Sequence, residues 1–197
     1  MVIRVLHIST EYPPHRVVGS LAFQVRDLVT RLSSKYEIYL IHPAGFEGNY
    51  IDGNVYVHTV SDRWFSDVVA YMHFLLVEVL SKIPYIVPRD IHLIHSHDWI
   101  ASVIARVLSQ RLRVPYLASV YTTEPMRSGG SMNLLNLSIM DWEKHAFSSA
   151  LYVIAHNKQA LDSLRRDYGI EAVETRSIED IEKIYDNTTH NANKAMP

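Results

Sequence analysis

Residues 92–99 read His-Leu-Ile-His-Ser-His-Asp-Trp. A short apolar run ends there, and Asp98 opens a stretch with helical periodicity, so the segment is typical of a buried strand that turns directly into a helix. In open α/β sheets, ligands bind at the carboxyl ends of the strands, where such a turn lies. The segment therefore predicts that His95, His97 and Asp98 lie at a ligand-binding edge.

The same alternation of strand and helix continues along most of the chain. Short runs rich in β-branched and aromatic residues predict six strands, at 2–8, 37–41, 55–60, 92–95, 116–121 and 151–155. Apolar residues at helical spacing predict helices around 21–32, 100–108, 135–142 and 161–168. Because parallel strands need crossover helices, we expect an α/β fold with a Rossmann-like, doubly wound parallel sheet.

Length and composition limit the domain organisation and the class of protein. The 197 residues suffice for one domain, which we expect at 1–170, followed by an amphipathic helix at 171–187 that packs on it and a disordered polar tail at 188–197. The absence of cysteine excludes disulfides and thiolate metal sites, and the chain starts as a strand rather than a signal peptide, so we expect a cytoplasmic protein. A net charge of −2 offers no basic field for nucleic acid.

Residues 64–80 form the most apolar helical stretch. Asp67, His73 and Glu78 interrupt it, and it is shorter than the roughly 20 residues that span a bilayer. We therefore expect a helix that is buried on most of its faces. Trp64 at its start leaves open the alternative of an interfacial helix in peripheral membrane contact.

Two long loops are expected at the same edge as Asp98. Residues 9–18 contain Pro13-Pro14 before a helix whose first N–H groups can face an anion. Residues 122–131 contain Gly129-Gly130, which permit a mobile lid or a tight turn. Polar loops that converge at one edge of a sheet make a cleft, which is the default ligand site.

Three ordered motifs carry a resemblance to a known family. They are Arg4-Val-Leu-His-Ile-Ser-Thr-Glu-Tyr-Pro-Pro14 with Gly19-Ser20-Leu-Ala, then His95-Ser-His-Asp-Trp99, then Ser119-Val-Tyr-Thr-Thr-Glu124 with Arg127. Over residues 1–170 the chain resembles the N-terminal domain of retaining GT-B glycosyltransferases of the glycogen and starch synthase kind and of groups 4 and 5. The resemblance implies that this domain binds the glycan acceptor. It also implies that a nucleotide sugar, such as ADP- or UDP-glucose, is bound mainly by a C-terminal domain and serves as substrate.

Carried over by position, the resemblance assigns three sets of site residues. Those expected near the donor phosphates are Gly19, Ser20 and Arg16. Those expected at the reacting centre are Tyr121, His97 and Asp98. Those expected to contact the acceptor are Glu11, Trp99, Glu124 and Arg127.

Two positions depart from the family pattern. Tyr121 stands where the family commonly has a histidine, and Val17 stands where glycogen synthases have a lysine. A phenol, with a pKa near 10, is a poor replacement for imidazole near neutral pH. The loss of the lysine weakens or reroutes the phosphate contact. The family's paired-glutamate stretch, which holds the donor, is also not reproduced, so we expect the chain alone to be inactive.

Structural explanations compete with these roles. Asp98 can be a helix N-cap, and Trp99 can anchor its helix by packing, which is the interpretation we favour for the tryptophan. Glu11, Glu124 and Arg127 can be loop residues whose charged side chains are simply solvated.

A metal site is an alternative interpretation of three histidines in the first segment. His92, His95 and His97 alternate along a strand and so share one face, as zinc ligands can. Both faces of a central parallel strand are covered, however, so we expect histidines packed in the core and neither a metal nor another cofactor.

Several functions remain open at this point. The first is the acceptor-binding half of a hexosyltransferase, completed by a separate donor-binding subunit or by a homo-oligomer. The second is a non-catalytic glycan-binding or regulatory module, which Tyr121 and Val17 favour. A fragment of a complete enzyme is a further alternative. A dinucleotide-binding domain is disfavoured, because the first turn lacks Gly-x-Gly-x-x-Gly.

Overall fold

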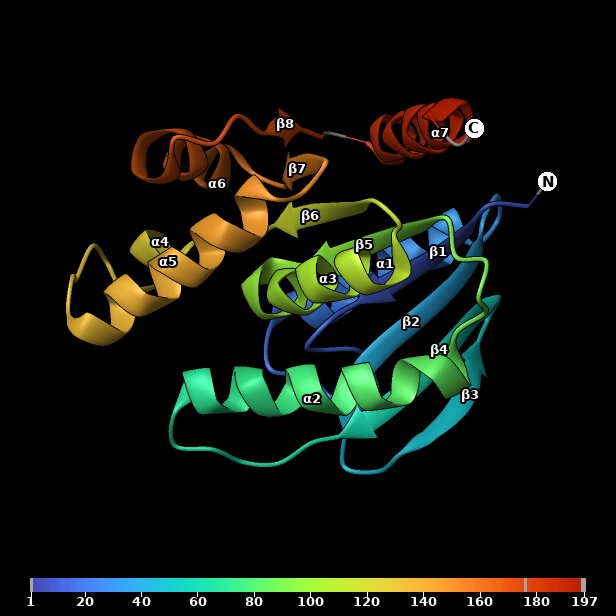
Figure 1. Cartoon of the computed structure of the whole chain (residues 1–197). Helices are drawn as coiled ribbons and strands as arrows, with labels where there is room; N and C mark the ends of the chain where they lie inside the picture. The colour runs from blue at the N-terminus through green and yellow to red at the C-terminus, as the bar shows by residue number, and fades with distance from the viewer. Residues whose placement is uncertain (1, 176, 196–197) are drawn as a thin grey trace.

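The computed structural model describes residues 2–175 and 177–195, with side chains up to Thr189. A single sheet has the strand order β3-β4-β2-β1-β5-β6-β7-β8, and only the β3–β4 pair is antiparallel (Figure 1). The strands are β1 (Arg4–Ile8), β2 (Glu37–Ala44), β3 (Gly48–Asp52), β4 (Val55–Ser61), β5 (Leu93–His97), β6 (Tyr116–Val120), β7 (Tyr152–Ala155) and β8 (Val173–Glu174). The helices are α1 (Ser20–Leu32), α2 (Val68–Ile86), α3 (Asp98–Leu112), α4 (Glu124–Arg127), α5 (Leu134–Ser148), α6 (Lys158–Ser163) with the π-helical turn Leu164–Tyr168, and α7 (Ile178–Ala195).

The connections change direction between β1 and β5. After β1 the chain builds β2, β3 and β4 on one side of it, then returns to place β5 on the other side and continues outward through β6, β7 and β8. The loops that follow β1 and β5 therefore leave in opposite directions. Open α/β sheets bind ligands in the crevice that this reversal creates at the carboxyl ends of the strands.

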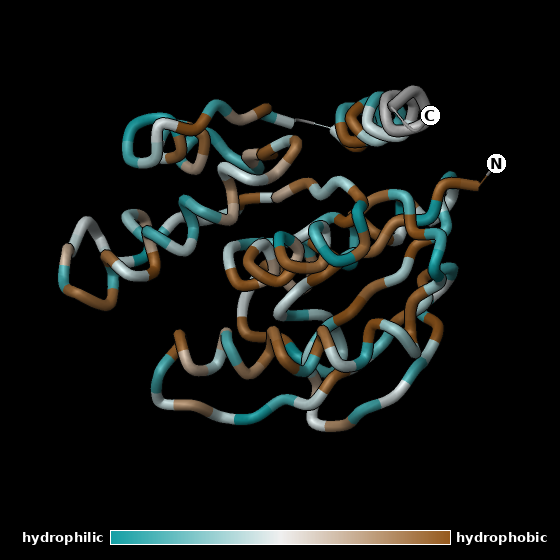
Figure 2. The backbone as a smooth tube through the Cα atoms, in the orientation of Figure 1, coloured by the Kyte–Doolittle hydropathy of each residue, from teal (hydrophilic) through white to brown (hydrophobic). Residues whose placement is uncertain are grey.

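Helices cover both faces of the sheet. On one face, α2, α3 and α5 pack on one apolar cluster, and on the other face α1 and α7 pack on a second (Figure 1). Strand residues divide between the clusters by alternation, so that Val5 joins the α1 and α7 side and Leu6 the opposite side. Figure 2 shows apolar residues along much of the central strands, as expected for strands that are buried on both faces. The predicted Rossmann-like, doubly wound sheet is confirmed.

All six predicted strands are present, with ends that differ by at most three residues from the prediction. β3 and β8 were not predicted. β3 joins β4 through a tight turn at Gly53, whose φ is +63°. Asp52 pairs with Val55, so the loop is the dipeptide Gly53-Asn54, which is a hairpin signal when it separates two strand-like runs, and this strand pair was readable from the sequence. β8 is only two residues long and carries no such signal.

The prediction that the apolar helix at 64–80 is buried on most faces is wrong. The buried residues of α2 form a single stripe at helical spacing, which comprises Met72, Leu75, Val79 and Ile83. Outside the stripe, Val77 is 64% exposed and Tyr85 is 86% exposed. Within the described part of the chain, α2 is the one helix that is long and apolar enough to cross a membrane by length and composition, which by itself is weak evidence.

The C-terminal helix is longer than the sequence predicted. α7 continues to Ala195, beyond Asn187, where a disordered tail was expected to begin. No proline or glycine interrupts this stretch, and the hydroxyls of Thr188 and Thr189 donate to carbonyls one turn earlier in the helix. Residues 196–197 of the expected tail lie outside the described residues. The helix is held by Ile181, Ile184 and Tyr185, which are buried in the cluster that α1 also covers.

Candidate functional site

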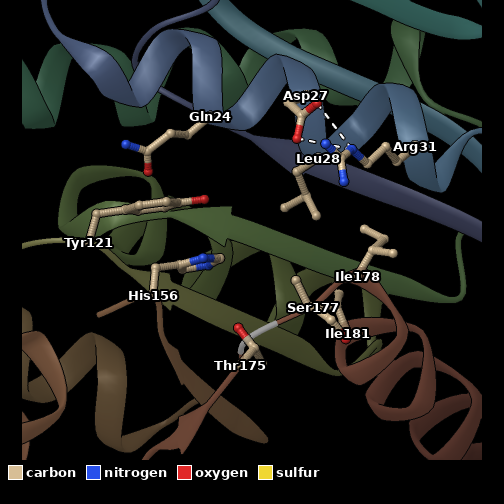
Figure 3. Close-up of a pocket in the computed structure, with 10 residues that line it drawn as sticks. All are labelled: Gln24, Asp27, Leu28, Arg31, Tyr121, His156, Thr175, Ser177, Ile178 and Ile181. Atoms are coloured by element: carbon tan, nitrogen blue, oxygen red, sulfur yellow. Dashed lines mark hydrogen bonds and ion pairs between the residues drawn. The ribbon is translucent and has the colours of Figure 1, made fainter. Parts of the chain in front are cut away.

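A pocket of about 300 Å³ opens between α1, the carboxyl ends of β6 and β7, and the start of α7. We call it the α1–α7 pocket (Figure 3). It is lined by Gln24, Asp27, Leu28, Arg31, Tyr121, His156, Thr175, Ser177, Ile178 and Ile181. The lining combines two aromatic rings with hydroxyl, amide and charged groups, which is the composition of a site for a polar organic ligand.

Tyr121 and His156 form one wall of the pocket. Each follows the last residue of its strand, β6 for Tyr121 and β7 for His156, so parallel pairing brings them side by side. Their rings are stacked, with centroids 4.1 Å apart and planes 6° from parallel (Figure 3). Burial lowers the pKa of His156 to about 4 and raises the pKa of Tyr121, so both are neutral at pH 7.

The polar edge of α1 forms the opposite wall. The helix buries Leu28 and Leu32 against the sheet, which turns Gln24, Asp27 and Arg31 toward the pocket (Figure 3). Arg31 Nε donates to the Asp27 carboxylate at 3.1 Å, and both side chains are more than 60% exposed. These groups can donate to and accept from the hydroxyls of a ligand.

Asp98 lies at the junction of β5 and α3, next to the loop that carries Tyr121. Its φ is +63°, a left-handed conformation that is uncommon outside glycine. Its carboxylate accepts from the N–H groups of Tyr121 and Thr122, at 3.0 and 3.4 Å. Burial raises its pKa to about 6, although these N–H groups and the charge of Arg127 act in the opposite direction. The side chain therefore fixes the loop after β6 and caps no N–H of α3, so the N-cap explanation is wrong.

His95 and His97 are buried completely, on the face of the sheet that α1 and α7 cover. The pKa of each is well below its ordinary value, because burial disfavours the charged ring. His97 reaches the pocket only through Tyr121, whose hydroxyl lies 3.3 Å from His97 Nδ1. His92 stands apart, and its Nδ1 accepts from the N–H of Arg4.

The residues expected near the donor phosphates already form hydrogen bonds or an ion pair within the chain. The N–H groups of Val18 and Gly19 donate to the Glu11 carboxylate at 2.9 and 2.8 Å, so the turn before α1 already binds a negative charge of its own chain. Ser20 accepts from Gln24 within α1. Arg16 pairs with Asp62, and both side chains line a different pocket from the α1–α7 pocket.

Two more of the expected acceptor residues belong to a separate ion-pair network. Arg127 donates to the carboxylates of Glu124 and Glu143, and Glu143 also accepts from the Tyr168 hydroxyl. Burial raises the pKa of Glu143, which is fully enclosed. Trp99, at the start of α3, is 7% exposed and packs in the apolar core. The interpretation that it anchors its helix by packing is confirmed.

Sequence reasoning missed most of the pocket lining. His156 follows β7 just as Tyr121 follows β6, so the rule that sites lie at strand ends could have identified it. Gln24, Asp27 and Arg31 carry no such signal, because a polar stripe on an amphipathic helix is typical of a solvated face.

The comparisons with known proteins bear on this arrangement. The model of the family described as Glycosyltransferase Family 4 matches residues 21–179. The chain belongs to glycosyltransferase family 4.

Relatives and solved structures agree with this assignment. Over 133 residues this family-4 chain is 31% identical to an uncharacterized glycosyltransferase of Methanocaldococcus jannaschii, a match that covers 64% of the chain and 33% of that relative. Its fold is similar to sucrose-phosphate synthase of Thermosynechococcus elongatus, with a TM-score of 0.69 at 11% identity, covering 88% of the chain and 47% of the enzyme. Starch synthase IV of Arabidopsis thaliana gives a TM-score of 0.55 at 14% identity, covering 88% of the chain and 51% of that catalytic domain.

The family-4 domain covers only part of each of these relatives. The chain spans about a third of the curated relative and about half of each full structure. A shorter form of the sucrose-phosphate synthase gives a TM-score of 0.64 at 12% identity over 96% of this chain and 98% of that one. The family-4 domain thus has the fold of the N-terminal half of a GT-B glycosyltransferase.

Proposed function

We propose that the chain is the acceptor-binding half of a hexosyltransferase. The complete enzyme would transfer a hexose from a nucleotide sugar, such as ADP- or UDP-glucose, to a glycan that this half binds. The observation that carries this proposal is the α1–α7 pocket, which lies at the carboxyl edge of a family-4 sheet and is lined by neutral Tyr121 and His156 opposite Asp27 and Arg31. A ring of hydroxyl groups both donates and accepts hydrogen bonds, and these side chains supply both functions.

The roles within the pocket follow from the contacts. Tyr121 is the residue we place against the reacting sugar hydroxyl, since its ring lines the pocket. His97 and Asp98 act through it: the imidazole contacts its hydroxyl and the carboxylate holds its N–H. Both are therefore positioning residues, and the contribution we assign to them is the orientation of Tyr121.

The donor side is proposed to require a second domain. A nucleotide sugar would approach the turn at Gly19, where its phosphate has to replace the Glu11 carboxylate on two N–H groups. The solved starch synthase is bound to ADP and acarbose, which supports a nucleotide sugar and a glycan as the two substrates here. The proposal holds whether the donor-binding domain lies on a separate subunit or is covalently continuous with this chain, and we place the assembly in the cytoplasm.

The first experiment measures the composition of the native assembly and its transfer activity in the same preparation. The protein is purified from its native cells under mild salt, weighed by native mass spectrometry, and assayed for glucose transfer from ADP- and UDP-glucose to maltotriose. We expect a donor-binding domain in the particle, transfer activity, and a loss of at least tenfold in kcat/KM for Asp27→Asn. The matched control is Asp162→Asn, which removes an exposed carboxylate paired with Lys158 and should leave the rate unchanged.

The second candidate is a glycan-binding or regulatory module without chemistry. Two points favour it: Tyr121 stands where the resemblance leads us to expect a histidine, and the Glu11 carboxylate accepts from the N–H groups of the turn expected to meet phosphate. A homodimer or monomer that binds maltotriose but transfers no sugar would replace the first proposal with this one.

A further inference from the structure

A group of buried polar residues lies beneath the pocket, next to the apolar cluster that α1 and α7 cover. His7 of β1 lies in register with His95 of β5, and His97 lies two residues further along the same face. The three rings are fully buried, with centroids 4.7 to 5.3 Å apart. Burial lowers the pKa of His7 to about 3 and those of the other two well below the ordinary value. Each ring is therefore neutral at pH 7 and has one N–H donor and one acceptor nitrogen.

The contacts of these rings continue from the pocket into the core. The Tyr121 hydroxyl lies 3.3 Å from His97 Nδ1, and His97 Nε2 lies 2.9 Å from His7 Nδ1. His7 Nε2 lies 3.2 Å from the hydroxyl of Tyr185, which α7 inserts into the sheet face. A single path of hydrogen bonds thus leads from the pocket wall to α7.

A second path leads from α7 back to the pocket. The Tyr185 hydroxyl lies 2.6 Å from His95 Nδ1, and His95 Nε2 lies 2.7 Å from the Ser119 hydroxyl. Ser119 in turn lies 2.8 Å from Nε2 of His156. The chain of contacts therefore begins and ends on the two stacked rings of the pocket wall (Figure 3).

Counting donors shows that the protons along this path depend on one another. Each interior imidazole uses one nitrogen on either side, and each interior hydroxyl has a single proton to donate. A hydroxyl that accepted from both of its neighbours would leave its own proton without an acceptor among the contacts of the path. The protons of the rings and interior hydroxyls are therefore all used along the path only when they point the same way. In the first order, Tyr121 donates inward, His7, His95 and His97 carry their protons on Nε2, and His156 carries its proton on Nδ1. In the second order, each of these rings has the other tautomer, and the Tyr121 proton is free to point into the pocket.

We propose that these seven residues form one directional hydrogen-bond chain, which couples the donor or acceptor state of Tyr121 to the tautomer of His156 through the core and α7. His7, His95, Ser119 and Tyr185 are then positioning residues for the pocket. A ligand atom that accepts from Tyr121 selects the second order, and one that donates to it selects the first. A sugar hydroxyl can accept from Tyr121 or donate to it. The chain therefore lets the same pocket wall bind a sugar hydroxyl in either role. The nature of the ligand rests on the proposed function, whereas the coupling of the tautomers does not.

The competing interpretation of the cluster is a metal site. Among the described residues, ligand atoms of His7, His95 and His97 lie within 4.8 Å of one another. All six of their ring nitrogens already have hydrogen-bond partners, and no carboxylate among the described contacts compensates an ion there. A metal would have to break the chain, which makes metal binding an outcome that separates the two interpretations.

The test is the tautomer of each ring in the ligand-free, full-length chain, read from the ¹⁵N resonances of its two ring nitrogens at pH 7.5. We expect His7, His95 and His97 to share one tautomer and His156 to have the opposite one. Different tautomers within the three, or a charged ring, would overturn the proposal. So would stoichiometric binding of Zn²⁺ that removes the N–H signals of the three rings.

The variant Tyr185→Phe cuts the chain at its midpoint. A buried N–H without a partner is rarer than an unpaired acceptor, so each ring that faces the new phenyl should keep an unprotonated nitrogen there. His7 should then carry its proton on Nδ1 and His95 on Nε2, so that the shared tautomer is lost. Unchanged tautomers in this variant would refute the coupling.

Two further variants keep the result interpretable. Tyr36→Phe is the matched control, because the Tyr36 hydroxyl donates to Asp186 at the same helix interface and lies outside the chain. It should leave all four tautomers unchanged. Ser119→Ala cuts the chain between His95 and His156 and gives a second test if the Tyr185 variant does not fold. If the shared tautomers are found but maltotriose does not bind, the chain stands and the proposed function fails.

Discussion

Replacement of Asp98 by asparagine should make the protein more stable at pH 8. The carboxyl has a folded pKa of about 6 against 3.8 in the unfolded chain, because burial disfavours its charge. Between these values the folded state holds a proton that the unfolded state has released, so stability falls as pH rises from about 4 to about 6. The shift of about two units corresponds to roughly 3 kcal/mol at pH 8 that the ionised carboxylate costs, since one unit is about 1.4 kcal/mol.

The asparagine variant removes this cost and keeps the geometry. Its amide oxygen can still accept from the N–H groups of Tyr121 and Thr122, which the Asp98 carboxylate binds now. Urea unfolding at pH 4 and at pH 8 gives the free energy of unfolding of both proteins. We expect the variant to equal the wild type within about 1 kcal/mol at pH 4 and to exceed it by up to about 3 kcal/mol at pH 8.

A carboxylate at the surface provides the control. Asp141→Asn removes a side chain that is 71% exposed and should change the two free energies alike. The reasoning is refuted if Asp98→Asn follows the same pH dependence as the wild type, or if it is less stable than the wild type at pH 8. A gain in stability with a loss of transfer activity would identify Asp98 as a charge retained for function.

Three further predictions concern the core and the surface. Glu143→Ala should lower the free energy of unfolding by about 3 kcal/mol, because it leaves the buried Tyr168 hydroxyl and the N–H of Glu124 without their acceptor, whereas Glu171→Ala, at an exposed pair, should change it by less than about 1 kcal/mol. Phe147→Ala should cost about 3–5 kcal/mol in urea unfolding, since the ring is fully buried, and equal loss for the 85% exposed Leu134→Ala would contradict this. Trp64 is 86% exposed in the loop that precedes the apolar helix α2, so Trp64→Ala should at least halve co-sedimentation with vesicles of mixed zwitterionic and anionic lipid. A wild-type protein that stays in the supernatant would end the proposal of peripheral membrane contact.

The fold was readable from the sequence because its signals are local. Strand runs separated by helical periods specify a parallel sheet, and the strand that ends at His97 lies at its centre, as the apolar segment around it indicated. The extent of burial of α2 was misjudged, because mean apolarity does not say how many neighbours a helix has. The single stripe around Met72 and Leu75 shows that only one side of this helix meets the rest of the described chain.

The site was only partly readable, because its parts come from elements far apart in the sequence. The rule that ligands bind at strand ends pointed to Asp98, and the resemblance to the family pointed to Tyr121. The Tyr121 N–H donates to the Asp98 carboxylate at 3.0 Å. Whether a strand-end side chain faces solvent or core depends on the helix above it, and the sequence does not show that α7 places Tyr185 over His95. The burial of the histidines therefore became visible only with the tertiary packing.

Titration of the ¹⁵N-labelled protein with maltotriose, glucose 6-phosphate and sucrose tests the proposed acceptor site most directly. Binding of a sugar at the α1–α7 pocket predicts saturable shifts at the amides of Arg31, Tyr121 and His156, which Asp27→Asn weakens and Asp162→Asn does not. Shifts confined to another surface, or none with any of the three sugars at 50-fold excess, would contradict the assignment of this pocket as the acceptor site.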